Sequence, residues 1–158
     1  MGEVVTEPAA EVGGLYEREG ARLWRAVFAY AQDRALTDDA VAEAFAQCLR
    51  RREEVRDPRA WVWRAAFRIA AGELRARRRF QPLAVEPSAV DEIGAVELLR
   101  VLARLPGNQR AAAVLHWYAG FDTGEVAEML GIARGTVRVH LSRARRHLAS
   151  FLDEEVER

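Results

Sequence analysis

Hydrophobic residues recur three or four positions apart along most of the chain, and Gly and Pro interrupt this pattern at intervals. The strict alternation typical of strands is nearly absent. The pattern predicts three helices in the first half, over about residues 15–32, 37–54 and 58–79. It predicts four more in the second half, over about residues 91–104, 108–119, 123–130 and 134–152. The expected fold class is therefore all-α.

The breaks between these helices predict two helical domains joined by a flexible linker. Pro82 and Pro87 lie in an acidic stretch without hydrophobic periodicity, which is typical of a linker. Gly13-Gly14 is expected to open the first helix. The predicted organisation is a disordered tail, a first domain, a linker and a second domain, over residues 1–14, 15–80, 81–90 and 91–158.

Two local signals refine the helices of the first domain. Thr37 is expected to cap the second helix, because Asp38 and Asp39 would then lie in its first turn, where carboxylates suit the helix dipole. Gly72 falls inside the third helix, where glycine costs about 1 kcal/mol relative to alanine. We therefore expect a break near residues 68–72.

The charges are segregated although the formal net charge is zero. Residues 1–49 hold 4 Arg against 9 acids, whereas residues 50–80 hold 11 Arg against 4 acids. Residues 131–152 hold 5 Arg and no acid. Two separate basic blocks in a neutral protein predict two surfaces that face a polyanion.

The second domain contains the pattern of a helix-turn-helix. Ala127, Gly131 and Val137 supply a small residue at the helix crossing, a residue tolerant of the turn, and an apolar anchor for the second helix. The opposite face of that helix carries polar and basic residues: Arg134, Thr136, Arg138, Ser142, Arg143, Arg145 and Arg146. A merely solvated face usually alternates its charge signs, so five arginines without an acid favour DNA binding in the major groove.

The third helix combines arginines with aromatic residues. Arg64, Arg68 and Arg75 follow one side, and Trp61, Trp63 and Phe67 are interleaved with them. Such a surface suits single-stranded or unpairing nucleic acid, because arginine follows phosphates while aromatic rings stack on bases. The alternative is that these aromatic residues belong to the hydrophobic core.

No pattern of catalytic residues is present, so we do not expect an enzyme or a bound cofactor. The three histidines have no metal-ligand spacing, and the sole cysteine, Cys48, excludes an internal disulfide and a multi-cysteine zinc site. No apolar run approaches the ~20 residues that cross a bilayer. We expect a cytoplasmic protein without membrane insertion.

Four short segments together resemble the extracytoplasmic-function (ECF) sigma factors of the sigma-70 family, from about residue 15 to residue 152. In the first domain these are DDAVAEAF at 38–45 and DPRAWVWR at 57–64. In the second they are LPGNQR at 105–110, and GTVR at 135–138 with LSRA at 141–144. Each is short, but their order and separation are specific.

The resemblance implies core RNA polymerase, promoter DNA and an anti-sigma protein as partners. The residues implied to bind the polymerase clamp are Asp38, Asp39, Glu43 and Phe45. Those implied to open the −10 element are Arg59, Trp61, Arg64, Phe67, Arg68 and Arg75. The −35 element would be read by the basic helix face, through Arg134, Thr136, Arg138, Ser142, Arg143, Arg145 and Arg146.

Three departures from the family pattern carry expectations of their own. Ala42 stands where a Gln commonly contacts the clamp, which predicts weaker polymerase binding. Arg68 replaces a frequent Asn, which predicts an altered −10 preference, and His140 replaces a basic residue facing DNA.

Two other functions fit parts of the sequence. A stand-alone helix-turn-helix regulator would use the second domain alone and would have no need of the acidic second helix or the aromatic third. A sigma-like protein kept only to bind a regulatory partner would explain the departures at Ala42 and Arg68.

Overall fold

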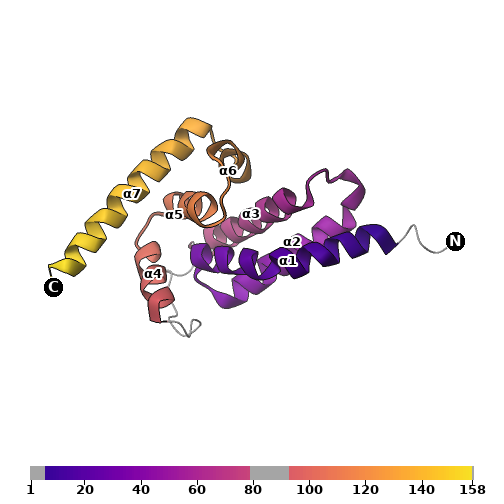
Figure 1. Cartoon of the computed structure of the whole chain (residues 1–158), viewed down its shortest axis with the longest axis horizontal. Coiled ribbons are helices and arrows are strands. Elements are labelled where there is room, and N and C mark those ends of the chain that lie inside the picture. The colour runs from indigo at the N-terminus through magenta and orange to yellow at the C-terminus, as the bar shows by residue number, and fades with distance from the viewer. Residues whose placement is uncertain (1–5, 79–92, 158) are drawn as a thin grey trace.

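The computed structural model describes residues 6–78 and 93–157, and within these ranges every regular element is helical (Figure 1). The first unit, residues 6–78, consists of α1 (Thr6–Ala31), α2 (Arg34–Arg50), a 3₁₀ turn η1 (Arg52–Glu54) and α3 (Pro58–Arg78). The second unit, residues 93–157, consists of α4 (Ile93–Ala103), α5 (Gly107–Ala113), η3 (Val114–Tyr118), α6 (Thr123–Leu130) and α7 (Arg134–Val156). The all-α fold with two helical units is confirmed, and the predicted linker lies outside the described residues.

Helix α1 begins well before Gly13-Gly14. The prediction of a disordered tail over residues 1–14 is wrong for residues 6–14, which are helical. Val12 and Leu15 are buried in the core, and Arg52 forms an ion pair with Glu11. These contacts offset the poor helix propensity of the two glycines.

Helix α2 is capped by Asp33 and not by Thr37. The Leu36 amide donates to the Asp33 carboxylate at 2.9 Å, while Thr37 lies one turn further on, fully buried, with its hydroxyl donating to the Asp33 carbonyl at 2.7 Å. The early start is possible because Gln32 adopts a left-handed conformation, with φ of 56°, and ends α1 abruptly. A non-glycine residue in this region is uncommon, so the sequence offered no signal for it.

Helix α3 is continuous, so the predicted break near residues 68–72 is absent. Its apolar side is buried at Val62, Ala66, Ala70 and Leu74, on both sides of Gly72. Gly72 itself is exposed, with open space around it. Burial of the opposite side holds the helix together despite the intrinsic cost of glycine.

The second unit contains the predicted helix-turn-helix. Gly131 ends α6 in the left-handed conformation, with φ of 67°, and Val137 anchors α7 with no exposed surface. Asp122 caps α6 in a capping box with Glu125, in which each side chain accepts from the other residue's amide. These features confirm the pattern found in the sequence and set the angle between the two helices.

One turn of the second unit departs from the expected regular helix. Residues Val114–Tyr118 are π-helical, and the Ala119 amide donates to the Val114 carbonyl at 3.0 Å. The turn leaves Trp117 and Tyr118 about two-fifths exposed, while Leu115 is buried.

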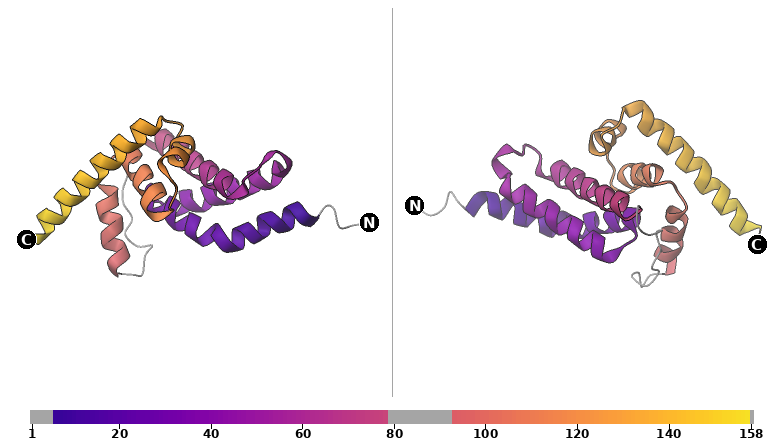
Figure 2. Two further views of the ribbon diagram at one scale, coloured as in Figure 1. Left: turned by 45° about the horizontal axis from the view of Figure 1, so that its top comes forward. Right: turned by 180° about the vertical axis from the view of Figure 1, so that it is seen from behind.

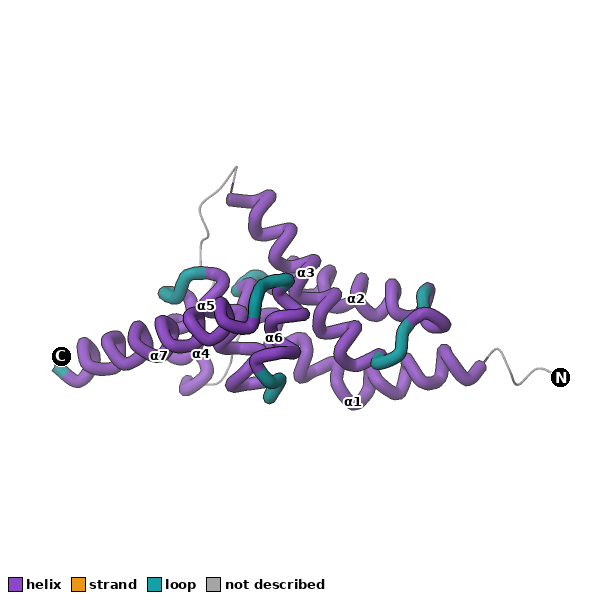
Figure 3. The backbone as a smooth tube through the Cα atoms, turned by 90° about the horizontal axis from the view of Figure 1, so that it is seen from above, coloured by secondary structure: helices purple, strands orange, loops and turns teal. Residues whose placement is uncertain are grey.

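The two units pack against each other, which the sequence did not predict. Helix α3 lies against α6, and α1 lies against α4 and η3 (Figures 2 and 3). Helix α7 projects away from the first unit, and the termini of the described chain lie at opposite ends (Figure 1).

Candidate nucleic-acid interface

The basic face of α7 is exposed along the helix. Val137, Leu141 and Ala144 are buried on the other side, as predicted. The seven residues predicted to bind DNA are all exposed: Arg134, Thr136, Arg138, Ser142, Arg143, Arg145 and Arg146. The structure therefore brings them together on one helix surface.

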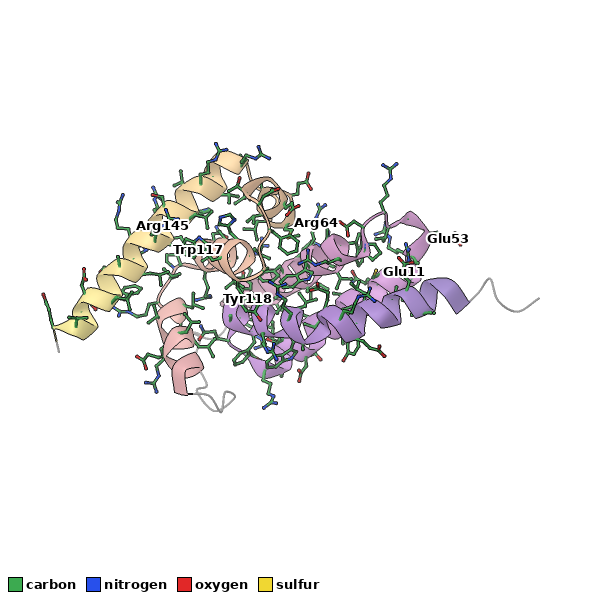
Figure 4. The ribbon with its side chains drawn as sticks, in the orientation of Figure 1. Glu11, Glu53, Arg64, Trp117, Tyr118 and Arg145 are labelled. Carbon is green, nitrogen blue, oxygen red and sulfur yellow. The ribbon has the colours of Figure 1, made fainter. Side chains whose placement is uncertain are left out.

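The charge of this face has no acidic partner among the described side chains. Within the described ranges, none of the five arginines of α7 forms an ion pair. Arg145 lies over the Trp117 ring, 5.6 Å from its centroid, where Figure 4 shows both side chains beside α7. Unpaired guanidinium groups on a rigid helix can bind phosphates or guanine edges bidentately.

The middle of α3 presents a second basic surface. Arg64, Arg68 and Arg75 are exposed, and Trp61 is half-buried beside them. Figure 4 shows Arg64 near the junction with the second unit. This surface offers cations for phosphates and one accessible aromatic ring.

Two of the predicted α3 residues lie elsewhere. Phe67 is 2% exposed, and its ring stacks on Tyr30 and Trp63, with centroids 5.4 and 6.4 Å apart. Its predicted contact with melted DNA is wrong, because the ring is part of the core. Arg59 is half-buried and already has a partner, because its Nε donates to the Glu19 carboxylate at 2.8 Å.

The acidic side of α2 is accessible in part. Asp38 accepts from the Trp24 indole at 2.7 Å, and Asp39 is exposed. Hydrogen bonds from Gln47 and then Arg50 hold the pKa of Glu43 below its usual value, so the carboxylate is charged at neutral pH. These three carboxylates form an anionic surface on α2.

Phe45 does not belong to that surface. It is 7% exposed, and its ring lies edge-on to Tyr16 at 5.1 Å. The prediction that Phe45 contacts polymerase is therefore wrong for this conformation. The sequence did not identify Trp24 as a neighbour of this surface. Trp24 lies fourteen residues before Asp38, so no local pattern indicated the hydrogen bond between them.

Two of the three histidines, His116 and His147, have hydrogen-bond partners, whereas the buried His140 Nδ1 has none in the described part of the chain. His116 Nδ1 lies 2.7 Å from the Phe121 carbonyl, and His147 Nδ1 lies 2.9 Å from Gln109 Oε1. Among residues 6–78 and 93–157, no group of three or more His, Cys, Asp or Glu is placed to hold a metal ion. Nor does any helix in these ranges combine the length and apolarity of a membrane span.

Similarity to known proteins extends over both units. Residues 95–148 match the family described as Sigma-70, region 4. The ECF RNA polymerase sigma factor SigL of Mycobacterium tuberculosis (strain ATCC 25618 / H37Rv) is 31% identical over 161 residues, which cover 92% of this chain and 91% of SigL. This chain belongs to the ECF sigma factors.

A second ECF sigma factor and two solved structures are also similar to this chain. SigM of the same strain is 32% identical over 179 residues, covering 92% of this chain and 90% of SigM. The solved structure of CnrH in complex with the cytosolic domain of CnrY has a TM-score of 0.71 and 25% identity, covering 95% of this chain and 92% of CnrH. RpoE, solved with the anti-sigma factor NepR from Bartonella quintana, shares the fold, with a TM-score of 0.69 at 20% identity over 87% of this chain and 96% of RpoE.

These similarities favour a sigma factor over a stand-alone helix-turn-helix regulator. A stand-alone helix-turn-helix regulator would need to resemble ECF sigma factors only in the second unit. The similarity to SigL covers nearly the whole chain, including the acidic α2 and the aromatic α3.

Proposed function

We propose that this ECF sigma factor binds core RNA polymerase and directs it to a class of promoters. The observation that carries the proposal is the pair of exposed arginine surfaces, one on α7 and one on the middle of α3, in a single chain. Such a protein is an initiation factor and not an enzyme, and it acts in the cytoplasm. Its partners are core polymerase and promoter DNA.

The second unit would bind the −35 element as a duplex. Helix α7 enters the major groove by its N-terminal turns, where Thr136 and Arg138 reach base edges. The remaining exposed residues contact phosphates or neighbouring bases, namely Arg134, Ser142, Arg143, Arg145 and Arg146. A bidentate arginine contact with guanine discriminates by about 1–3 kcal/mol.

The first unit would open the −10 element. Arg64, Arg68 and Arg75 follow the phosphates, while Trp61 stacks on an unpaired base, a contact that contributes about 1–3 kcal/mol. Arg59 joins this set only when it is released from Glu19.

The anionic surface of α2 would bind polymerase through Asp38, Asp39 and Glu43. An anti-sigma protein is a further expected partner, because the solved relatives CnrH and RpoE were each captured with a partner protein, CnrY and the anti-sigma factor NepR. It would compete for this surface or for the basic surfaces described above.

Run-off transcription with purified core polymerase tests the proposal. Genomic fragments serve as templates, and transcripts should start at a defined set of promoters only when the chain is added. Gel filtration of the same mixture should show co-elution with core. Co-elution without any transcript above the core-alone background would leave a protein that binds polymerase but does not initiate.

Trp61→Ala separates opening from binding. The variant should bind promoter in closed complexes like the parent but should expose fewer −10 thymines to permanganate. Arg100→Ala, at an exposed residue of α4, is the control and should behave like the parent. Unchanged permanganate reactivity of Trp61→Ala would rule out the stacking role.

A further inference from the structure

The guanidinium of Arg134 lies on the first turn of α6. Arg134 is the first residue of α7, and Gly124 is the second residue of α6. A β-carbon at residue 124 would lie 3.1 Å from Cζ and 3.2 Å from Nε of Arg134, and closer still to its Nη2. These distances are shorter than ordinary van der Waals contact, so the guanidinium occupies the space that a side chain at residue 124 would need.

Both carboxylates at the start of α6 are engaged with backbone amides. Asp122 Oδ1 accepts from the Glu125 amide at 2.8 Å, and Glu125 Oε2 accepts from the Asp122 amide at 3.1 Å. Among the ion pairs of residues 6–78 and 93–157, none includes Arg134. Arg134 therefore packs closely against α6 while its charge has no carboxylate partner there.

The role of α6 in a helix-turn-helix indicates what this guanidinium meets. In such motifs the second helix lies in the major groove, while the first helix crosses the DNA backbone. Helix α6 lies beside the start of α7 (Figure 1). A guanidinium on the first turn of α6 is therefore placed at the backbone, and not over the base edges that the next residues of α7 would read.

We infer that Gly124 is a positioning residue that directs Arg134 to a phosphate of the duplex. The inference rests on the proposed function of α7 and deepens it, because it assigns Arg134 to the backbone and leaves Thr136 and Arg138 to read bases. Phosphate contacts fix the position of a protein on the duplex without carrying sequence information. A guanidinium that is already held against α6 loses less rotational freedom on binding, so the absence of a side chain at residue 124 raises the affinity for DNA.

Gly124→Ala tests this role, because its β-carbon would displace only the far end of a flexible side chain. Alanine is the better helix former, so the variant should unfold at the same temperature as the parent or at a higher one. It should nevertheless bind DNA about two- to tenfold more weakly, since the side chain of Arg134 must then be ordered on binding. A role of Gly124 in stability alone would change the unfolding temperature and leave the affinity for DNA unchanged.

Fluorescence anisotropy of the full chain with two kinds of duplex measures the affinity. One is a short fluorescein-labelled duplex of mixed sequence at low salt, where phosphate contacts dominate binding. The other carries the −35 element of a promoter found by run-off transcription, together with its single-base variants. Gly124→Ala should weaken binding by the same factor on every duplex, and Arg134→Ala should do so by a larger factor.

A double-mutant cycle shows whether Gly124 acts through Arg134. In the Arg134→Ala background, Gly124→Ala should leave the affinity unchanged. Arg134→Ala should also reduce the slope of log affinity against log salt by about 1, as expected for one lost phosphate contact. Gly13→Ala is the matched control and should bind like the parent, because Gly13 is an exposed glycine of α1 with open space around it.

An affinity of Gly124→Ala equal to that of the parent would overturn the inference. A loss that persists in the Arg134→Ala background would do the same, and so would a loss for Arg134→Ala that is confined to one base pair of the −35 element. A parent chain that binds neither kind of duplex would overturn it as well.

The proposed function fails in a different way. If the parent initiates no transcript with core polymerase, but Gly124→Ala weakens binding to the mixed-sequence duplex only when Arg134 is present, the positioning role stands and the proposed function fails. If the parent initiates transcription and Gly124→Ala binds every duplex like the parent, the proposed function stands and the positioning role fails.

Discussion

Helices α3 and α7 carry similar sequence patterns and use their arginines differently. Each helix has a buried apolar side and an opposite side that carries a row of arginines. On α7 the arginines are exposed, and none forms an ion pair within the described ranges. On α3, Arg59 pairs with Glu19 of α1, and Arg77 pairs with Asp33, the residue that caps α2. These ion pairs connect both ends of α3 to the other helices of the first unit.

The difference shows that an arginine row is not by itself a binding surface. On α7 all five arginines are exposed, and Arg145 also lies over the Trp117 ring, so the positive charge of the row points to DNA. On α3 the arginines in the middle of the row are exposed, whereas Arg59 and Arg77 have structural partners. The aromatic residues divide in the same way, since Trp61 is half-buried while Trp63 and Phe67 are core.

The largest expected effect is on stability and concerns Phe67. This aromatic residue of α3 lies in the core, whereas the exposed face of α7 carries only polar and basic residues among the predicted DNA contacts. Phe67→Ala should lower the free energy of unfolding by about 3–5 kcal/mol, because it leaves a cavity beside Tyr30 and Trp63. Urea denaturation followed by circular dichroism measures this. Arg64→Ala, on the exposed side of α3, should change it by less than about 0.5 kcal/mol. A small loss for Phe67→Ala would put the ring back among the DNA-contact candidates.

The next effect tests whether the exposed arginines of α7 recognise the base sequence of the −35 element. Arg138→Ala should weaken binding to a −35 duplex by about 1–3 kcal/mol and relax the preference at one base pair. Binding to a panel of single-base variants of the duplex would measure both. Arg100→Ala, which removes a charge from α4, should leave the preference intact. A uniform loss across the panel for Arg138→Ala would assign this residue to phosphate contact only.

A smaller effect concerns the support of α7 by α6. Asp122→Ala removes the cap and half of the capping box, and it should lower the free energy of unfolding by about 1 kcal/mol. Thermal and urea denaturation of the full chain measure the change. Asp153→Ala, an exposed residue near the end of α7, should have little effect. Equal stabilities of the two variants would show that the capping box contributes nothing measurable.

The smallest effect concerns the structural arginine at the end of α3. Burial raises the pKa of Asp33, but the hydrogen bond from the Leu36 amide and the Arg77 guanidinium outweigh it, so the pKa of this carboxyl in the folded chain lies below its ordinary value. The charged form therefore stabilises the fold above about pH 4, and this contribution is lost as pH falls through the folded pKa. Since both side chains are partly exposed, we expect it to be less than about 1 kcal/mol.

Asp33→Asn tests this pH dependence, because asparagine keeps a good N-cap but does not titrate. Urea denaturation between pH 7 and pH 3 should show the variant less stable at neutral pH, with the difference shrinking in acid. Arg77→Gln removes the same ion pair from the other side and should lose a similar amount at neutral pH. A constant difference between Asp33→Asn and the parent at all pH values would contradict the assignment.

Much of this protein could be predicted from its sequence. Helical periodicity and breakers placed the helices to within a few residues in most cases, and α6 over residues 123–130 was predicted at its observed bounds. The spacing of Ala127, Gly131 and Val137 identified the helix-turn-helix, because that motif depends on local geometry. The exposed face of α7 followed from the same periodicity.

Tertiary structure decided what covers each apolar or charged side chain. Periodicity shows that Phe45 and Phe67 lie on particular helix faces, but only packing against Tyr16 and against Tyr30 shows that they are core. The same holds for the cap at Asp33, which depends on the left-handed turn at Gln32.

The sequence by itself determined most of the helices, the two basic blocks and the family. The three-dimensional arrangement decided which arginines are available and how the units meet, through contacts such as that of Phe121 with Trp63. The reason is physical: helix formation and amphipathicity depend on neighbours within about two turns, whereas burial depends on residues far away in the chain.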